Sequence, residues 1–301
     1  MLPSGLNLPW IRYGGDFGAN AWSPAGGLST RPTDQVRRLI GRAAAAGAQV
    51  VRWFVLCDGR AGIRFGPDGL PQALQPVVLD DMACALDLLG AHGLRMMPVL
   101  LDFTWGDAPR VVNGVALGGR LPVLRDPLAR AALWRVVDDL VAPFGRHPGI
   151  AAWDLWNEPE WLMRPWRAPA RRLSGARLRQ ALEELALHVR WHATQPLTVG
   201  LASTRGLPLC RTLELDILQV HWYDPLERRA PLAHRPQVSW SRAPWLLGEY
   251  PTRGSARPPG AIVAAAREAG YDAAWPWSLQ ADDRSSDSEA ALRAVTHDRN
   301  A

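Results

Sequence analysis

The stretch WDLWNEPE, residues 153 to 160, places charged side chains in a run that otherwise has the composition of a buried strand. Asp154 follows one tryptophan and precedes another. Asn157 and Glu158 then come directly before a proline, which favours a turn at that point. The question is which fold puts a glutamate at the end of a buried strand, and the segments on either side answer it.

Strand-like and helix-like segments alternate on both sides of this stretch. Apolar, β-branched or aromatic runs predict eight strands, at residues 10–15, 49–55, 94–103, 150–157, 197–203, 216–223, 244–250 and 272–277. Amphipathic helices are expected between most of them, at residues 33–46, 78–92, 125–144, 175–192, 260–270 and 288–295, with a weak short helix after the fifth strand and an ill-defined segment after the sixth. Eight such units predict a single (β/α)8 barrel over residues 1–301, with an open doubly wound sheet as the alternative.

Connection lengths support the barrel. The connections from helix back to strand are short, as in AGAQ, AHG and EAG, whereas several connections from strand to helix are much longer. The strand-to-helix loops of a barrel all emerge at its C-terminal face, where active sites of this fold lie. Glu158 and Glu249 are both expected at that face, because each ends an apolar strand.

Composition excludes several classes of protein. The chain contains no lysine, so Schiff-base enzymes, pyridoxal-phosphate enzymes and Walker A nucleotide sites are excluded. Its three cysteines are far apart, and no H-x-H, H-E-x-x-H or G-x-S-x-G motif is present. The chemistry is therefore expected to need neither metal nor cofactor.

Charge and hydropathy bear on partners and location. The net charge is +5, but the arginines are scattered along the chain, which favours a solvated basic surface over a nucleic-acid site. No apolar run is long enough for a membrane helix. A monomer is expected. Without a visible signal peptide the chain is expected in the cytoplasm, or outside the cell if a leader has been removed.

Two glutamates on one face suggest glycoside hydrolysis. A retaining glycosidase needs a carboxylic acid that protonates the leaving oxygen and a carboxylate about 5 to 5.5 Å away that attacks the sugar. Arg52, near the end of the second strand, is a charge that could keep such a nucleophile ionised. Alternatively it forms an ordinary ion pair at the barrel rim.

The motifs VVRWFV, WDLWNEPE, HWY, LLGEY and WSL, in this order, resemble the (β/α)8 retaining glycoside hydrolases, including the family 5 cellulases and β-mannanases. The resemblance spans nearly the whole chain and implies that Glu158 is the acid/base and Glu249 the nucleophile. It further implies that Asn157 binds the sugar 2-hydroxyl and that His221 and Tyr223 support the glutamates. VVRWFVLCDG and the GG of VALGGR favour the mannanase-like branch.

Aromatic and acidic residues complete the expected site. Trp277 resembles the tryptophan that forms the floor under the sugar, with Trp275 as a competing assignment. Trp105, Trp161 and Trp166 lie in strand-to-helix loops, where exposed aromatic faces suggest sugar stacking, with packing within a lid as the alternative.

Many family members have a histidine at the end of the third strand, where this chain has Asp102. Asp16, in GGDFG, contacts substrate or only forms a turn. A β-1,4-mannan is the first choice of substrate by the resemblance and a β-glucan the second. A transglycosylase and a silent polysaccharide-binding barrel are the rivals.

Overall fold

The computed structural model describes residues 2–163, 172–281 and 283–300. Eight parallel strands form one sheet in chain order, and the remaining strands form two small antiparallel hairpins. The sheet strands are β1 (Gly5–Asn7), β2 (Val50–Phe54), β5 (Arg95–Asp102), β8 (Trp153–Asn157), β9 (Leu197–Leu201), β10 (Leu218–His221), β11 (Trp245–Pro251) and β12 (Ala273–Trp277).

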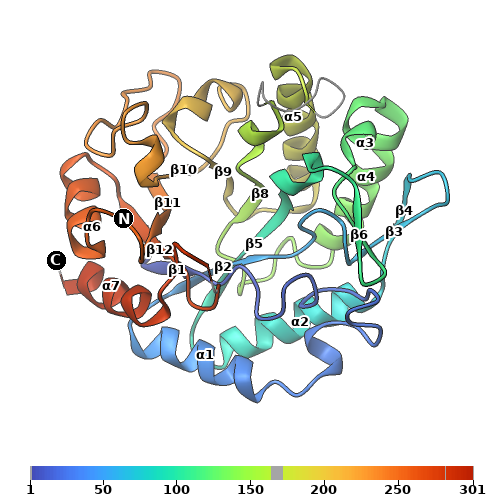
Figure 1. Ribbon diagram of the computed structural model, residues 1–301, viewed down its shortest axis with the longest axis horizontal. Coiled ribbons are helices and arrows are strands. Elements are labelled where there is room, and N and C mark those ends of the chain that lie inside the picture. The colour runs from blue at the N-terminus through green and yellow to red at the C-terminus, as the bar shows by residue number, and fades with distance from the viewer. Residues whose placement is uncertain (1, 164–171, 282, 301) are drawn as a thin grey trace.

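The sheet curls until its last strand reaches its first. β12 lies beside β1 (Figure 1), and across this seam the Asn7 side-chain amide donates to the carbonyl of Pro276 at 3.2 Å. The backbone N–H of Leu279 donates to the carbonyl of Asn7 at 2.8 Å. The molecule is therefore a (β/α)8 barrel, as the alternation predicted, and the open doubly wound alternative is wrong.

Helices surround the barrel (Figure 1). They are α1 (Asp34–Ala45), α2 (Val77–Gly90), α3 (Leu121–Arg125), α4 (Pro127–Val141), α5 (Gly175–His192), α6 (Pro259–Glu268) and α7 (Ser288–Asn300). Short 3₁₀ turns are η1 (Leu28–Thr30), η2 (Phe103–Gly106), η3 (Pro159–Met163), η5 (Thr204–Leu209) and η6 (Asp224–Leu226). The weak segment after β9 and the ill-defined one after β10 thus hold 3₁₀ turns, and neither contains an α-helix.

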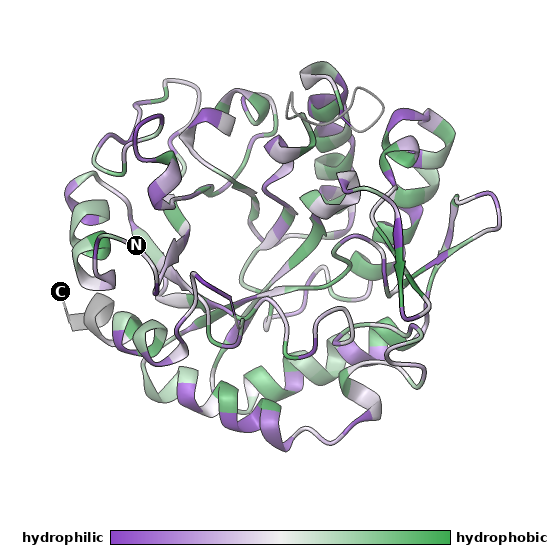
Figure 2. Cartoon of the chain, viewed as in Figure 1, coloured by the Kyte–Doolittle hydropathy of each residue, from purple (hydrophilic) through white to green (hydrophobic). Residues whose placement is uncertain are grey.

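The α4 helix shows why these segments are helical. Pro127 occupies its first turn, and the carboxylate of Asp126 accepts from the N–H of Ala129 at 2.8 Å, which caps the start. Leu133 and Val137, one turn apart, are buried, and the residues on the opposite side are exposed. Figure 2 shows the same division on α1, where purple residues lie on the outer side of the helix.

The first strand lies earlier in the chain than the sequence predicted. Residues 10–15 were expected to form it, but β1 is Gly5–Asn7, a short strand fully buried beside β2. Residues 10–15 instead form an irregular loop, because the buried carboxylate of Asp16 accepts from the N–H groups of Ile11 and Arg12 at 2.6 and 2.9 Å. These bonds fold the segment back as a turn.

Two hairpins occupy loops at the C-terminal end of the barrel strands. β3 (Ile63–Phe65) pairs with β4 (Pro71–Leu74) after β2, and β6 (Arg110–Val112) pairs with β7 (Val115–Leu117) after β5. Figure 1 shows both on the same side of the molecule. Among the described residues, no helix has the length and apolar character needed to cross a membrane.

Candidate active site

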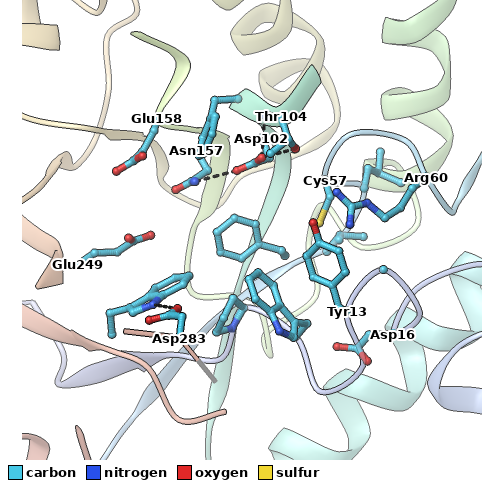
Figure 3. Close-up of a pocket in the computed structure, with 18 of the residues that line it drawn as sticks. Tyr13, Asp16, Cys57, Arg60, Asp102, Thr104, Asn157, Glu158, Glu249 and Asp283 are labelled. Atoms are coloured by element: carbon cyan, nitrogen blue, oxygen red, sulfur yellow. Dashed lines mark hydrogen bonds between the residues drawn. The ribbon is translucent and has the colours of Figure 1, made fainter. Parts of the chain in front are cut away.

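A pocket of about 510 Å³ opens where the barrel strands end. Its lining includes Asp102, Asn157, Glu158, Glu249 and the loops that follow β1, β2, β5, β10 and β12. Figure 3 shows Glu158 and Glu249 on one side of it, with Asp102 and Asn157 beside them. The volume is within the range of ligand pockets in general, about 300 to 1,000 Å³.

Glu158 and Glu249 face each other across the end of the barrel. Glu158 follows β8 with a φ of +48°, and its N–H donates to the carbonyl of Gly200 at 2.6 Å. Glu249 belongs to β11 and is buried. One oxygen of each carboxylate and a ring nitrogen of His221 lie within 4.8 Å of one another. These oxygens are closer together than the roughly 6.5 to 9.5 Å between the carboxyl groups of an inverting pair, which favours a retaining arrangement.

Arg52 lies beneath the glutamates and is fully buried. Its Nη1 donates to Glu249 Oε1 at 2.5 Å and its Nε to Asp154 Oδ2 at 2.8 Å. It also donates to the side-chain oxygens of Asn7 and Asn157, at 2.9 and 2.8 Å. Burial lowers the pKa of Arg52, but the two carboxylates raise it further, so the net direction is upward. Asp154, within the stretch WDLWNEPE, is thus the buried ion-pair partner of Arg52.

Glu249 is held from two sides. Arg52 bonds one of its oxygens, and the hydroxyl of Tyr223 donates to the other at 3.0 Å. Burial raises the pKa of Glu249 above that of an ordinary glutamate, while His221 and Arg52 oppose the rise. Both donors stabilise the ionised carboxylate, the form that a nucleophile needs.

His221 lies between the two glutamates and is neutral near pH 7. Its Nδ1 is 3.0 Å from Glu158 Oε1 and 3.5 Å from Glu249 Oε2. Burial lowers its pKa to about 4, although Glu249 opposes this. On the far side of the ring, the Gln219 amide nitrogen is 3.0 Å from Asp154 Oδ2 and 3.4 Å from His221 Nε2. The amide nitrogen only donates, so His221 Nε2 accepts and the proton of the neutral ring sits on Nδ1, toward the carboxylates.

Asp102 orients Asn157. The Asn157 amide nitrogen donates to Asp102 Oδ2 at 2.8 Å, while its oxygen accepts from Arg52, so the amide is fixed at both ends. Asp102 Oδ1 accepts from the N–H and the hydroxyl of Thr104, at 2.8 and 2.5 Å. Burial raises the pKa of Asp102 to about 6. Where the resemblance suggests a histidine, this chain therefore has an acceptor that faces Asn157.

The tryptophans divide into lining and core residues. Trp277 lines the pocket and its Nε1 donates to Asp283 at 2.9 Å, whereas Trp275 is buried and donates to the carbonyl of Pro3. Of the two assignments, only Trp277 faces the pocket. Trp161 also lines it and donates to Glu158 Oε2 at 2.5 Å.

Trp105 corrects an expectation. Predicted to offer an exposed face, it is fully buried in η2. Its Nε1 donates to the carbonyl of Cys57 at 2.6 Å, and its ring packs against Phe65 of the first hairpin and Trp156. It supports the loops without facing the pocket. Trp166 lies outside the described residues.

Trp10 and Tyr13 are among the lining residues that the sequence did not predict. Because residues 10–15 were assigned to a strand, Trp10 and Tyr13 were not considered as site residues. Asp16 lines the pocket, but its carboxylate accepts from two N–H groups of the loop and from Trp53 Nε1 at 3.0 Å, so it serves as a turn aspartate. The GG before it is the only local signal that this segment is a loop.

Within the described part of the chain, one group of potential ligands is compact enough for a metal ion, namely Glu158, His221 and Glu249. Their ligand atoms are already engaged. Glu249 bonds Arg52 and Tyr223, Glu158 bonds Trp161, and the Nδ1 hydrogen of His221 points at the carboxylates. The guanidinium at 2.5 Å would also repel a cation. The donor set therefore does not fit a resident metal.

Comparison with known proteins supports the barrel. No protein-family model matches the chain. A mannan endo-1,4-β-mannosidase of Cryptopygus antarcticus is 24% identical over 164 residues, which are 54% of this chain and 39% of that protein. The match thus spans about two fifths of the relative's length.

Solved structures match over nearly the whole chain. An endo-1,4-β-mannanase of Eisenia fetida is 18% identical with a TM-score of 0.80, covering 98% of this chain and 90% of its own. A Streptomyces cattleya protein solved with Manβ1-4GlcNAc is 16% identical with a TM-score of 0.71, covering 98% and 79%. At these identities, the similarity shows a shared fold.

Proposed function

We propose that the protein is a retaining β-glycoside hydrolase that acts on a β-1,4-mannan or a related oligosaccharide. The observation that carries the proposal is the pair Glu158 and Glu249, whose carboxylate oxygens lie within 4.8 Å of each other at the C-terminal mouth of the barrel. The names of the similar proteins favour a mannan-type substrate.

The proposed reaction has two steps. Glu158 gives its proton to the glycosidic oxygen, while a carboxylate oxygen of Glu249 attacks the anomeric carbon and the bond to the leaving group breaks. In the second step Glu158 takes a proton from water, whose oxygen attacks the anomeric carbon and releases Glu249. One carboxylate is thus anionic at each stage, and the Nδ1 hydrogen of His221 lies within reach of both.

The surrounding residues have distinct roles in this proposal. Arg52 and Tyr223 keep Glu249 ionised. Asn157, fixed by Asp102, faces the pocket and binds a sugar hydroxyl. Trp277 and Trp161 line the space beside the glutamates and contact the sugar ring. Neither a metal nor a cofactor takes part.

A reducing-sugar assay tests the proposal. Wild type, Glu158→Gln and Glu249→Ala are compared on β-mannan, glucomannan, carboxymethylcellulose, xylan and galactan, with the exposed Glu268→Gln on α6 as a matched control. We expect release from β-mannan by wild type and the control only. ¹H NMR of the first product should show the β-anomer, because two displacements retain the configuration.

Each of the other outcomes would indicate a different function or a different site residue. Release from carboxymethylcellulose alone would indicate a β-glucan-active enzyme, and longer products at high oligosaccharide concentration would indicate a transglycosylase. Folded wild type without activity on any of the five polymers would contradict the proposal and favour a silent polysaccharide-binding barrel. Activity in Glu249→Ala would refute the assignment of the nucleophile.

A further inference from the structure

Tyr13 is an exposed aromatic residue in the wall of the pocket, on the side away from the glutamates (Figure 3). The residue is 46% exposed. Exposed aromatic surface is costly, and where it lines a cavity it usually marks a binding face. The loop that carries it, residues 9–17, has no role in the chemistry proposed above.

One face of the Tyr13 ring packs against Arg60. The Arg60 guanidinium lies 4.1 Å from its centroid, and Arg60 is buried and joined to Asp58 by bonds of 2.7 and 3.1 Å. Asp58 in turn accepts from the N–H of Gly118 at 3.2 Å, which ties the pair to the second hairpin. A cation stacked on an aromatic face stabilises this arrangement and restricts the ring.

Gly14 makes room for this support. It has a φ of +66°, and a Cβ at this position would lie 2.4 Å from Cδ of Arg60. Only a residue without a side chain allows Arg60 to pass beneath the loop. The glycine next to Tyr13 therefore has a specific function in placing the ring, which accounts for part of the GGDFG motif.

A line of rings joins Tyr13 to the glutamate end of the pocket. Trp10 meets Tyr13 edge to face at 5.0 Å between centroids, and it meets Trp277 in the same way at 6.2 Å. Trp277 is fixed by its bond to Asp283. The lining of the pocket includes all three rings together with Glu249, so one continuous wall extends from the reacting groups to Tyr13.

We propose that Tyr13 is the stacking platform for a second pyranose ring of the substrate, beyond the ring held between Glu158 and Glu249. Pyranose rings present C–H faces that pack on aromatic rings, and a platform already fixed by Arg60 and Trp10 loses little conformational entropy on binding. This inference rests on the proposed function and extends it, because it makes the enzyme favour oligosaccharides over substrates with one sugar.

The alternative is that Tyr13 only packs within the loops. Trp22 stacks beside it, with centroids 6.3 Å apart and an interplanar angle of 27°, and donates to the carbonyl of Val112 in the second hairpin at 2.9 Å. In that case the ring would contribute to stability and not to recognition. The effect of substrate length on the loss of kcat/KM separates the two roles, because replacing a purely structural residue lowers kcat/KM equally for long and short substrates.

The test compares Tyr13→Ala, Tyr13→Phe and wild type on mannotetraose and on 4-nitrophenyl β-mannoside. Trp191→Ala is the matched control, since Trp191 is an 84% exposed aromatic residue on α5. We expect Tyr13→Ala to lower kcat/KM for mannotetraose about tenfold, mainly through KM, as for the loss of one aromatic contact. The loss for the aryl mannoside should be smaller, and Tyr13→Phe should stay within about twofold of wild type.

Equal losses on both substrates, or no loss on mannotetraose, would overturn the inference. Calorimetric titration of mannotetraose into Glu249→Ala, with and without Tyr13→Ala, checks binding apart from catalysis and should show the same tenfold difference in Kd. If wild type neither binds nor cleaves mannotetraose, the same experiments are run with cellotetraose. Failure of wild type on both would reject the proposed function itself, whereas cleavage by wild type with no effect of Tyr13→Ala rejects only this platform.

Discussion

Replacing Arg52 by methionine tests the buried charge network directly. Methionine keeps much of the apolar stem but removes the guanidinium that bonds Asp154 and Glu249. Asp154 retains bonds of 3.0 Å from the N–H of Gly200 and from Gln219, so both carboxylates stay inside the barrel without a cation. Removing one member of a buried ion pair costs about 3 to 5 kcal/mol, and we expect a loss of that size in the free energy of unfolding.

The loss in the free energy of unfolding of Arg52→Met should depend on pH. Burial already raises the pKa of Glu249 and Arg52 opposes the rise, so without the guanidinium that pKa lies further above its value in the unfolded chain. Folding then takes up protons, so the stability of the variant falls as pH rises through this interval. The deficit relative to wild type should therefore be larger at pH 8 than at pH 5.

Urea unfolding followed by tryptophan fluorescence measures this difference. Arg42→Met is the matched control, because Arg42 pairs with Glu289 on the surface, where the side chains are 43% and 64% exposed and a salt bridge is worth about 0 to 1 kcal/mol. If Arg52→Met does not fold, Arg52→Lys, which keeps the charge but not the fork of donors, takes its place. A loss no larger than that of Arg42→Met at both pH values would refute the reasoning.

Two further substitutions probe the glutamates through their partners. Tyr223→Phe removes the hydroxyl that bonds Glu249, so the pKa of Glu249 should rise further and the acidic limb of the kcat/KM profile should move to higher pH. We also expect kcat/KM at the optimum to fall about tenfold to a hundredfold, and an unshifted limb would argue against Glu249 as the group that must be ionised. Gln219→Leu removes the donor at His221 Nε2, so ¹⁵N NMR should show the Nδ1-H tautomer of wild type give way to a mixture, with His221→Ala to assign the signal. An unchanged tautomer would exclude Gln219 as its determinant.

The barrel could be predicted because its signal repeats along the chain. Seven of the eight sheet strands overlap residues assigned from periodicity, and β1 is the exception. It contains three residues, Gly5–Asn7, and a strand this short gives no measurable alternation. Residues 10–15 have the stronger strand propensity, but Asp16 holds them in a turn, and a bond between a side chain and the backbone leaves no periodic pattern.

The site was predictable where a residue follows a recognised strand. Arg52, Glu158, His221 and Glu249 meet at one place because parallel strands end on the same side of a barrel. The positions of loop residues are not fixed in this way by the strand order. The exposure of a loop residue depends on which other segments pack against it. The β3–β4 hairpin, which brings Phe65 against Trp105, was not expected. Trp105 was therefore predicted to be exposed, whereas it is fully buried.

The backbone of Glu158 has a consequence for the history of such barrels. Its φ of +48° is a left-handed conformation, which costs a residue with a side chain roughly 1 to 2 kcal/mol relative to glycine. Selection for stability alone would therefore favour glycine or asparagine at this position, whereas the proposed mechanism requires a carboxylate there. A related barrel that does not need this carboxylate would gain stability from glycine or asparagine at the equivalent position, so the residue found there indicates whether the carboxylate is required.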